Sequence, residues 1–109
     1  MPTRATRSTG KARLKRLIEE ATVDAYDEHE QVTGFLIRLE EHLAMPFTTR
    51  LLGDDVVVES LDVDELAILA VCRRGREKQR VRIQDLPLPK PPPAGAEWIA
   101  AYRQWARGQ

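Results

Sequence analysis

Apolar residues in the first half of the chain recur with the period of an α-helix. The first stripe falls on Leu14, Leu17, Ile18, Ala21 and Ala25, the spacing of an amphipathic helix. The second falls on Val32, Phe35, Leu36, Leu39 and Leu43. Asp27 and Glu30 match a capping box at the start of the second stripe, and Pro46 favours its end. Residues 11–45 are therefore predicted to form two helices, packed as a hairpin or a bent pair.

After Pro46 the pattern becomes typical of β-strands. Residues 48–52 are strand-like, Val56 opens a β-branched run, residues 66–72 are almost continuously apolar, and residues 79–83 alternate. Gly53 and Gly75 lie where tight turns are expected, and Gly75 is where a positive φ is expected. Four to five short strands at this spacing predict a small SH3-like β-barrel over residues 47–89.

The C-terminal part is predicted to be a proline-rich connector followed by a helix. Residues 90–95 contain Lys90-Pro91-Pro92-Pro93 and are typical of a stiff polyproline spacer. Residues 96–108 place Trp98, Ala101, Tyr102 and Trp105 on one side of a helix. We expect the two tryptophans to dock this helix on the barrel. A surface for a protein partner is the alternative interpretation.

Together these patterns predict an α+β fold in one domain, residues 11–109, preceded by a flexible basic arm at residues 1–10. No apolar run approaches the ~18 residues of a membrane span, and no apolar segment follows the basic N-terminus as in a secretory signal. The single cysteine, Cys72, fits a reducing compartment. We therefore expect a cytoplasmic protein with no membrane contact.

Charge is distributed in three blocks of alternating sign. Residues 1–17 carry six Arg or Lys and no acid, residues 18–65 carry fourteen acids against two Arg, and residues 66–109 carry nine Arg or Lys against three acids. The sums are +6, −12 and +6, so a net charge of zero hides large local fields. The blocks favour either a cation-binding acidic region or acidic and basic surfaces that neutralise each other.

The acidic block contains the oxygen ligands that Ca²⁺ prefers. Asp24 and Glu28 are four residues apart and share a helix face if the helix continues through this region. Glu40 and Glu41 lie near the C-terminal end of the second predicted helix, where a cation would relieve an unfavourable interaction with the helix dipole. Glu40 borders the apolar stripe and is expected to be the more shielded of the two.

Other metal and catalytic sites are not supported by the sequence. An EF-hand starting at Asp62 would need Gly at its sixth position and Glu at its twelfth, where the chain has Ala67 and Arg73. His29 and His42 are thirteen residues apart and cannot bind one ion from a common helix face. The sequence has no catalytic triad order, phosphate-binding glycine loop or CxxC motif, so we expect no enzyme.

The segment from Val23 to Gln31, with Gly34-Phe35, Leu39 to Leu43 and Pro46-Phe47, resembles the small bacterial calcium-binding protein family typified by a cyanobacterial calcium-binding protein. That family has an acidic helical part, a small barrel-like β part and a tryptophan-bearing C-terminal helix. The resemblance implies Ca²⁺ binding by the acids that match its acidic positions. These are Asp24, Glu28, Glu30, Glu40 and Glu41.

The sequence thus favours a non-catalytic calcium-binding protein, a buffer or a sensor, with Ca²⁺ bound by clustered carboxylates of the helical part. One alternative is a nucleic-acid-binding module that uses the Arg-rich hairpin 73–82, although no aromatic residue is interleaved there to stack on a base. Another is a protein-interaction module that uses the helix of Trp98 and Trp105.

Overall fold

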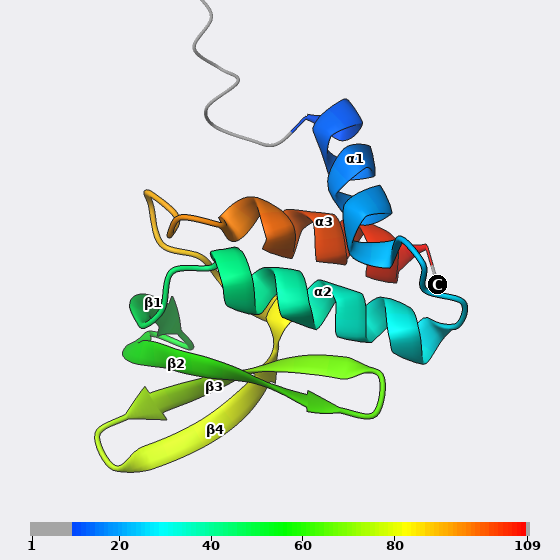
Figure 1. Cartoon of the computed structure of the whole chain (residues 1–109). Coiled ribbons are helices and arrows are strands. Elements are labelled where there is room, and N and C mark those ends of the chain that lie inside the picture. Colours follow the sequence, from blue (N-terminus) through cyan, green and yellow to red (C-terminus); the bar gives the residue numbers. More distant parts are fainter. Residues whose placement is uncertain (1–9, 109) are drawn as a thin grey trace, which may run out of the picture.

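The computed structural model describes residues 10–108, which form three helices and one antiparallel sheet (Figure 1). The arm predicted at residues 1–10 lies outside the described residues except for Gly10. The helices are α1 (Lys11–Thr22), α2 (Glu28–His42) and α3 (Ala96–Arg107). The strands are β1 (Phe47–Leu51), β2 (Asp54–Asp64), β3 (Ala67–Arg74) and β4 (Glu77–Arg82), and a short 3₁₀ turn, η2 (Ile83–Asp85), follows β4.

All three helices lie on the same side of the sheet (Figure 1). Helices α2 and α3 run side by side over it, and α1 crosses both. The α+β prediction, with two N-terminal helices and one C-terminal helix, is confirmed. None of the helices within residues 10–108 combines the length and the apolar character needed to cross a bilayer.

The predicted SH3-like barrel is wrong, because the four strands form an open meander in the order β1-β2-β3-β4. Closing a barrel requires the two edge strands to pair and every strand to contribute interior side chains. β4 cannot do so, since five of its six residues are exposed and only Val81 is half-buried. Helices α2 and α3 cover the apolar face instead, through Val58, Ile68, Ala70 and Cys72.

The helix boundaries agree with the sequence patterns except between α1 and α2. Asp27 caps α2, and its carboxylate accepts a hydrogen bond of 2.8 Å from the Glu30 N–H. The first helix ends at Thr22, so Ala25 lies in the connection between the helices and not on the apolar stripe. The second helix ends at His42, before Pro46, as the proline predicts.

The aromatic residues of α3 pack mainly against α2. The Phe35 ring lies 5.4 Å from that of Tyr102 and 5.3 Å from that of Trp105, and Trp98 stacks on His42 at 5.4 Å. Trp98 and Trp105 are 4% and 9% exposed. The expectation that they dock α3 on a barrel is therefore wrong. Neither ring is available as a partner surface, so the interaction module based on them is also wrong.

Glycine permits the close approach of α1 to α2. A Cβ atom added to Gly34 would lie 1.9 Å from the backbone oxygen of Ala21. No side chain fits in that space, so the two helices touch backbone to backbone at this point. The crossing fixes the end of α1, and the connection that follows it, against the exposed side of α2.

Candidate metal centre

The five acids implied as calcium ligands lie at the two ends of α2. Asp24 is in the α1–α2 connection, and Glu28 and Glu30 are in the first turn of α2. Glu40 and Glu41 are in its last turn. Twelve residues separate Glu28 from Glu40, which corresponds to about 18 Å along a helix axis. One ion cannot contact both ends, so the five acids divide into an N-terminal group and a C-terminal group.

In the N-terminal group, Asp24 and Glu30 line one shallow groove, but Glu28 does not. Asp24 adopts a φ of 62°, which turns the chain between the two helices. No helix continues through this segment, so the predicted shared face of Asp24 and Glu28 is not formed. Glu28 lies four residues before Val32, on the side of α2 that carries the buried apolar stripe. Burial is the main reason that the pKa of Tyr102 is raised, and the charge of Glu28 adds to it.

The two carboxylates that cap α2 already accept backbone hydrogen bonds. Glu30 Oε1 accepts a bond of 2.6 Å from the Tyr26 N–H, while Asp27 Oδ1 accepts the bond from the Glu30 N–H. Each carboxylate keeps its second oxygen for another partner. The cap therefore holds the Glu30 side chain near Asp24 with part of its acceptor capacity unused.

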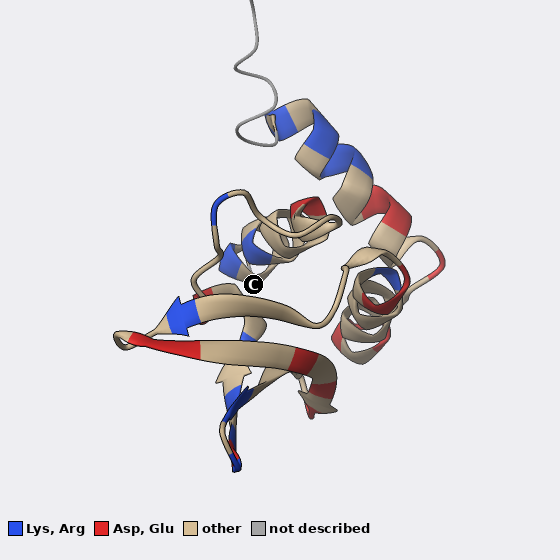
Figure 2. Ribbon diagram, turned by 90° about the vertical axis from the view of Figure 1, so that its left-hand side faces the viewer, with Lys and Arg blue, Asp and Glu red and all other residues tan. Residues whose placement is uncertain are grey.

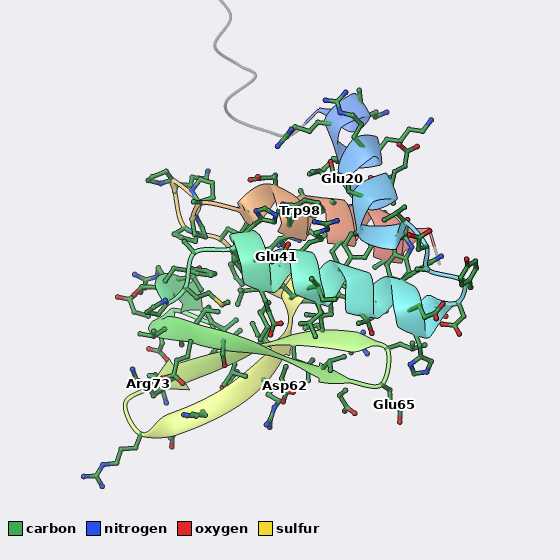
Figure 3. The ribbon with its side chains drawn as sticks, in the orientation of Figure 1. Glu20, Glu41, Asp62, Glu65, Arg73 and Trp98 are labelled. Atoms are coloured by element: carbon green, nitrogen blue, oxygen red, sulfur yellow. The ribbon has the colours of Figure 1, made fainter. Side chains whose placement is uncertain are left out.

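The C-terminal group is exposed to solvent. Glu40 is exposed, so the expectation that it is partly shielded is wrong. Glu41 lies 3.5 Å from Arg38 Nη1 and 3.8 Å from His42 Nε2. In Figure 3, Glu41 is on α2 and Trp98, whose ring stacks on His42, is on the adjacent α3. Arg38 therefore competes with a cation for Glu41, whereas no salt bridge within residues 10–108 involves Glu40.

As folded, the described residues contain no group of three or more His, Cys, Asp or Glu side chains that could hold a metal ion. Calcium usually takes six to eight oxygen ligands. Either group of acids would thus need backbone oxygens or water to complete a coordination shell.

Most acids of the sheet contact arginine or lysine side chains of other strands, although Asp64 has no such contact within residues 10–108. Glu59 sits at a β-bulge of β2 and contacts Arg73, and it lies 3.3 Å from Lys78 Nζ. Asp62 Oδ2 is 3.0 Å from Arg80 Nε. Asp62 and Arg73 are both on the sheet, away from Glu41 (Figure 3). Asp54 and Asp55 pair with Arg74 and Arg50.

These contacts lower the pKa of two sheet carboxyls. For Glu59 the hydrogen bond from Arg73 is the largest cause, and Lys78 adds to it against the opposing effect of burial. For Asp62 the largest cause is the hydrogen bond from the Val63 N–H, followed by that from Arg80. Both carboxylates are therefore held in the charged form by partners within the sheet.

The same pairs occupy most of the charge that the nucleic-acid alternative requires. Four of the six basic residues of hairpin 73–82 contact acids, and these are Arg73, Arg74, Lys78 and Arg80. Pairing of this kind reduces the positive potential available to a phosphate backbone.

The sequence showed the acidic and basic blocks of the chain but did not show which acid pairs with which base. Strand register was the missing information, and the bulge at Glu59 gave no signal in the sequence.

Figure 2 shows how the charges are distributed. Basic residues (blue) and acidic residues (red) are mixed on the strands, and red predominates from the end of α1 into the connection before α2. A family model described as calcium binding matches residues 15–106 of the chain. Comparison with curated proteins and with solved structures gave no match.

Proposed function

The chain belongs to the CcbP family of calcium-binding proteins, and from this membership we propose that it binds Ca²⁺ weakly, as a non-catalytic buffer or sensor. The observation that carries the proposal is that the acids near the two ends of α2 form fewer salt bridges than the acids of the sheet. Within residues 10–108, no salt bridge involves Asp24, Glu28, Glu30 or Glu40. Clustered carboxylates without a counter-charge repel one another, and a divalent cation removes that repulsion.

The proposed ligands form two independent sets. Asp24 and Glu30 would bind an ion in the groove between the helices, with Glu28 adding charge from the adjacent face of α2. Glu40 and Glu41 would bind at the other end of α2, where a cation also interacts favourably with the helix dipole. Each set offers few protein oxygens, so water would complete the coordination shell. Sites of this kind bind in the range of about 0.1–1 mM.

Thermal unfolding in Ca²⁺ and in EDTA, at fixed ionic strength, tests the proposal. A ligand that binds only the folded state stabilises it, and at ten times the dissociation constant the gain is about 1.4 kcal/mol. For a domain of this size we expect the melting temperature to rise by about 5–10 °C. An identical melting temperature in both buffers would contradict calcium binding.

Paired variants assign the ions to the two sets. Asp24→Asn with Glu30→Gln should remove the part of the rise in melting temperature that comes from the groove. Glu40→Gln with Glu41→Gln should remove the part that comes from the other end of α2. Asp64→Asn with Glu65→Gln is the matched control, because it makes the same change in charge at the end of β2 and in the turn that follows. If only the control pair abolished the shift, the ligands would lie at that turn and the assignment to the helices would be wrong.

A further inference from the structure

A concave surface lies where the end of α1 and the connection after it meet the exposed side of α2. We call it the α1–α2 groove. Its floor is the close contact of Ala21 with Gly34, its apolar sides include Val23 and Ile37, and Asp24 and Glu30 stand on its rim. The volume is about 290 Å³, enough to accept a side chain but small for a drug-sized ligand.

Large apolar side chains around the groove are exposed to solvent. Val23 is 61% exposed and Ile37 is 48% exposed. Tyr26, whose backbone N–H is bound by Glu30, is 88% exposed. Single exposed apolar residues are ordinary, but two that line one concavity, Val23 and Ile37, with a third, Tyr26, nearby in the chain, are typical of an interaction surface. This sets the groove apart from the rest of α2, whose apolar stripe of Val32, Phe35 and Leu39 is buried.

The groove is lined by two acids, Asp24 and Glu30, and by one histidine, His29, with no lysine or arginine. Residues 17–37 contain no lysine or arginine and six acids, which are Glu19, Glu20, Asp24, Asp27, Glu28 and Glu30. Arg38, the first basic residue after this stretch, contacts Glu41 at the other end of α2. The groove therefore combines an apolar floor with a negative rim, and the complement of such a surface is a positively charged segment with an apolar side chain.

We propose that the α1–α2 groove binds a basic segment of a partner protein, in which an aliphatic side chain is flanked by arginine or lysine. The aliphatic side chain packs on Val23 and Ile37, and the flanking cations contact Asp24 and Glu30. In one respect this inference rests on the proposed function, because Asp24 and Glu30 are also the proposed calcium ligands. Ca²⁺ and the segment then compete, and each lowers the affinity for the other by the same factor.

A short fluorescent peptide with one leucine between two arginine pairs is the probe, titrated into the full chain in EDTA and followed by anisotropy. We expect saturable binding that weakens as salt rises. Asp24→Asn with Glu30→Gln should weaken binding about tenfold, and Ile37→Ser by a similar factor through loss of apolar contact. The control pair Asp64→Asn with Glu65→Gln, which changes charge equally, should leave binding unchanged.

Several results would overturn the proposal. These are no binding, equal weakening by the groove pair and the control pair, or equal affinity for a peptide with glycine in place of leucine. A chain without residues 1–9 that bound the peptide about tenfold more tightly would assign the groove to the basic N-terminal residues, Arg4 and Arg7 among them, and not to a partner. Self-association removed by Ile37→Ser would assign it to a second copy.

Failure of this inference is distinguishable from failure of the proposed function. The peptide titration is carried out without calcium, and the thermal shift is measured without peptide. A calcium shift with no peptide binding would overturn only the docking surface. Peptide binding that Ca²⁺ does not reverse, in a chain that does show the shift, would overturn the shared use of Asp24 and Glu30.

Discussion

The acids of the helical layer and the acids of the sheet come from one continuous block of the sequence, yet they have opposite surroundings. On the sheet, Glu59 and Asp62 are held by Arg73 from the adjacent β3 and by Lys78 and Arg80 from β4, one strand further away. At the two ends of α2, Glu30 and Glu40 have no ion pair within residues 10–108. A count of charges along the chain places both groups in the same negative block, residues 18–65.

The difference follows from the geometry of the two kinds of element. Antiparallel strands place side chains from distant parts of the chain about 5 Å apart, so Arg73 on β3 reaches the acids of β2. The long side chains of Lys78 and Arg80 reach β2 from β4, across β3. On a helix surface the neighbours are three or four residues away, and α2 offers its acids only Arg38 at that spacing. Most acids of the sheet are thus structural ion pairs, although Asp64 has no such pair within residues 10–108, whereas Glu30 and Glu40 on α2 are available to an external cation.

The largest effect is expected from Gly34→Ala, which tests the helical side of the comparison. The added Cβ would lie 1.9 Å from the Ala21 oxygen, so α1 must move away from α2. Overpacking of this kind costs up to about 3 kcal/mol, and the better helix propensity of alanine returns about 1 kcal/mol. We expect a net loss of about 2 kcal/mol in the free energy of unfolding, measured by urea denaturation, together with a weaker calcium shift.

Gly108→Ala is the matched control for this prediction, because its Cβ would meet only the Trp105 oxygen at an ordinary 3.6 Å. A change of less than about 0.5 kcal/mol is expected there. Equal stability of the Gly34→Ala protein and the parent chain would show that α1 does not cross α2 at this glycine.

Two single charge removals should change stability in opposite directions. Glu59→Gln leaves Arg73 and Lys78 without their carboxylate and should lower the free energy of unfolding. Glu40→Gln removes a negative charge from the C-terminal turn of α2, where it is unfavourable, and should raise stability by about 0.3 kcal/mol. Urea denaturation of both variants at low ionic strength measures the contrast. Destabilisation of similar size in both would mean that α2 also contains a structural ion pair.

The smallest effect concerns pH. The folded state lowers the pKa of Glu59 and Asp62, so their contribution to stability is complete above the unfolded-state pKa and is lost as the pH falls through the folded-state value. Arg73→Gln with Arg80→Gln should make the free energy of unfolding depend less steeply on pH between about pH 5 and 2. Arg107→Gln, at the exposed end of α3, is the control and should leave the slope unchanged.

The sequence predicted the positions of the three helices and four strands because periodicity and turn residues act locally. It predicted the cap of α2 by Asp27 for the same reason. It did not predict that Asp24 would leave the helix or that Glu40 would be exposed, since both depend on how α1 crosses α2 at Gly34. The division of the five candidate ligands between two ends of one helix became visible only when the bounds of α2 were known.

Sequence by itself determined the α+β class, the family resemblance and the concentration of acids in residues 18–65. These are properties of residue order and type. Only the tertiary structure decided whether the sheet closes into a barrel. Closure requires β4 to contribute side chains to an interior, and its Arg and Lys side chains are exposed to solvent instead. Only the tertiary structure decided which acids keep a free charge, because cross-strand contacts join residues far apart in the chain and a helix surface joins near ones.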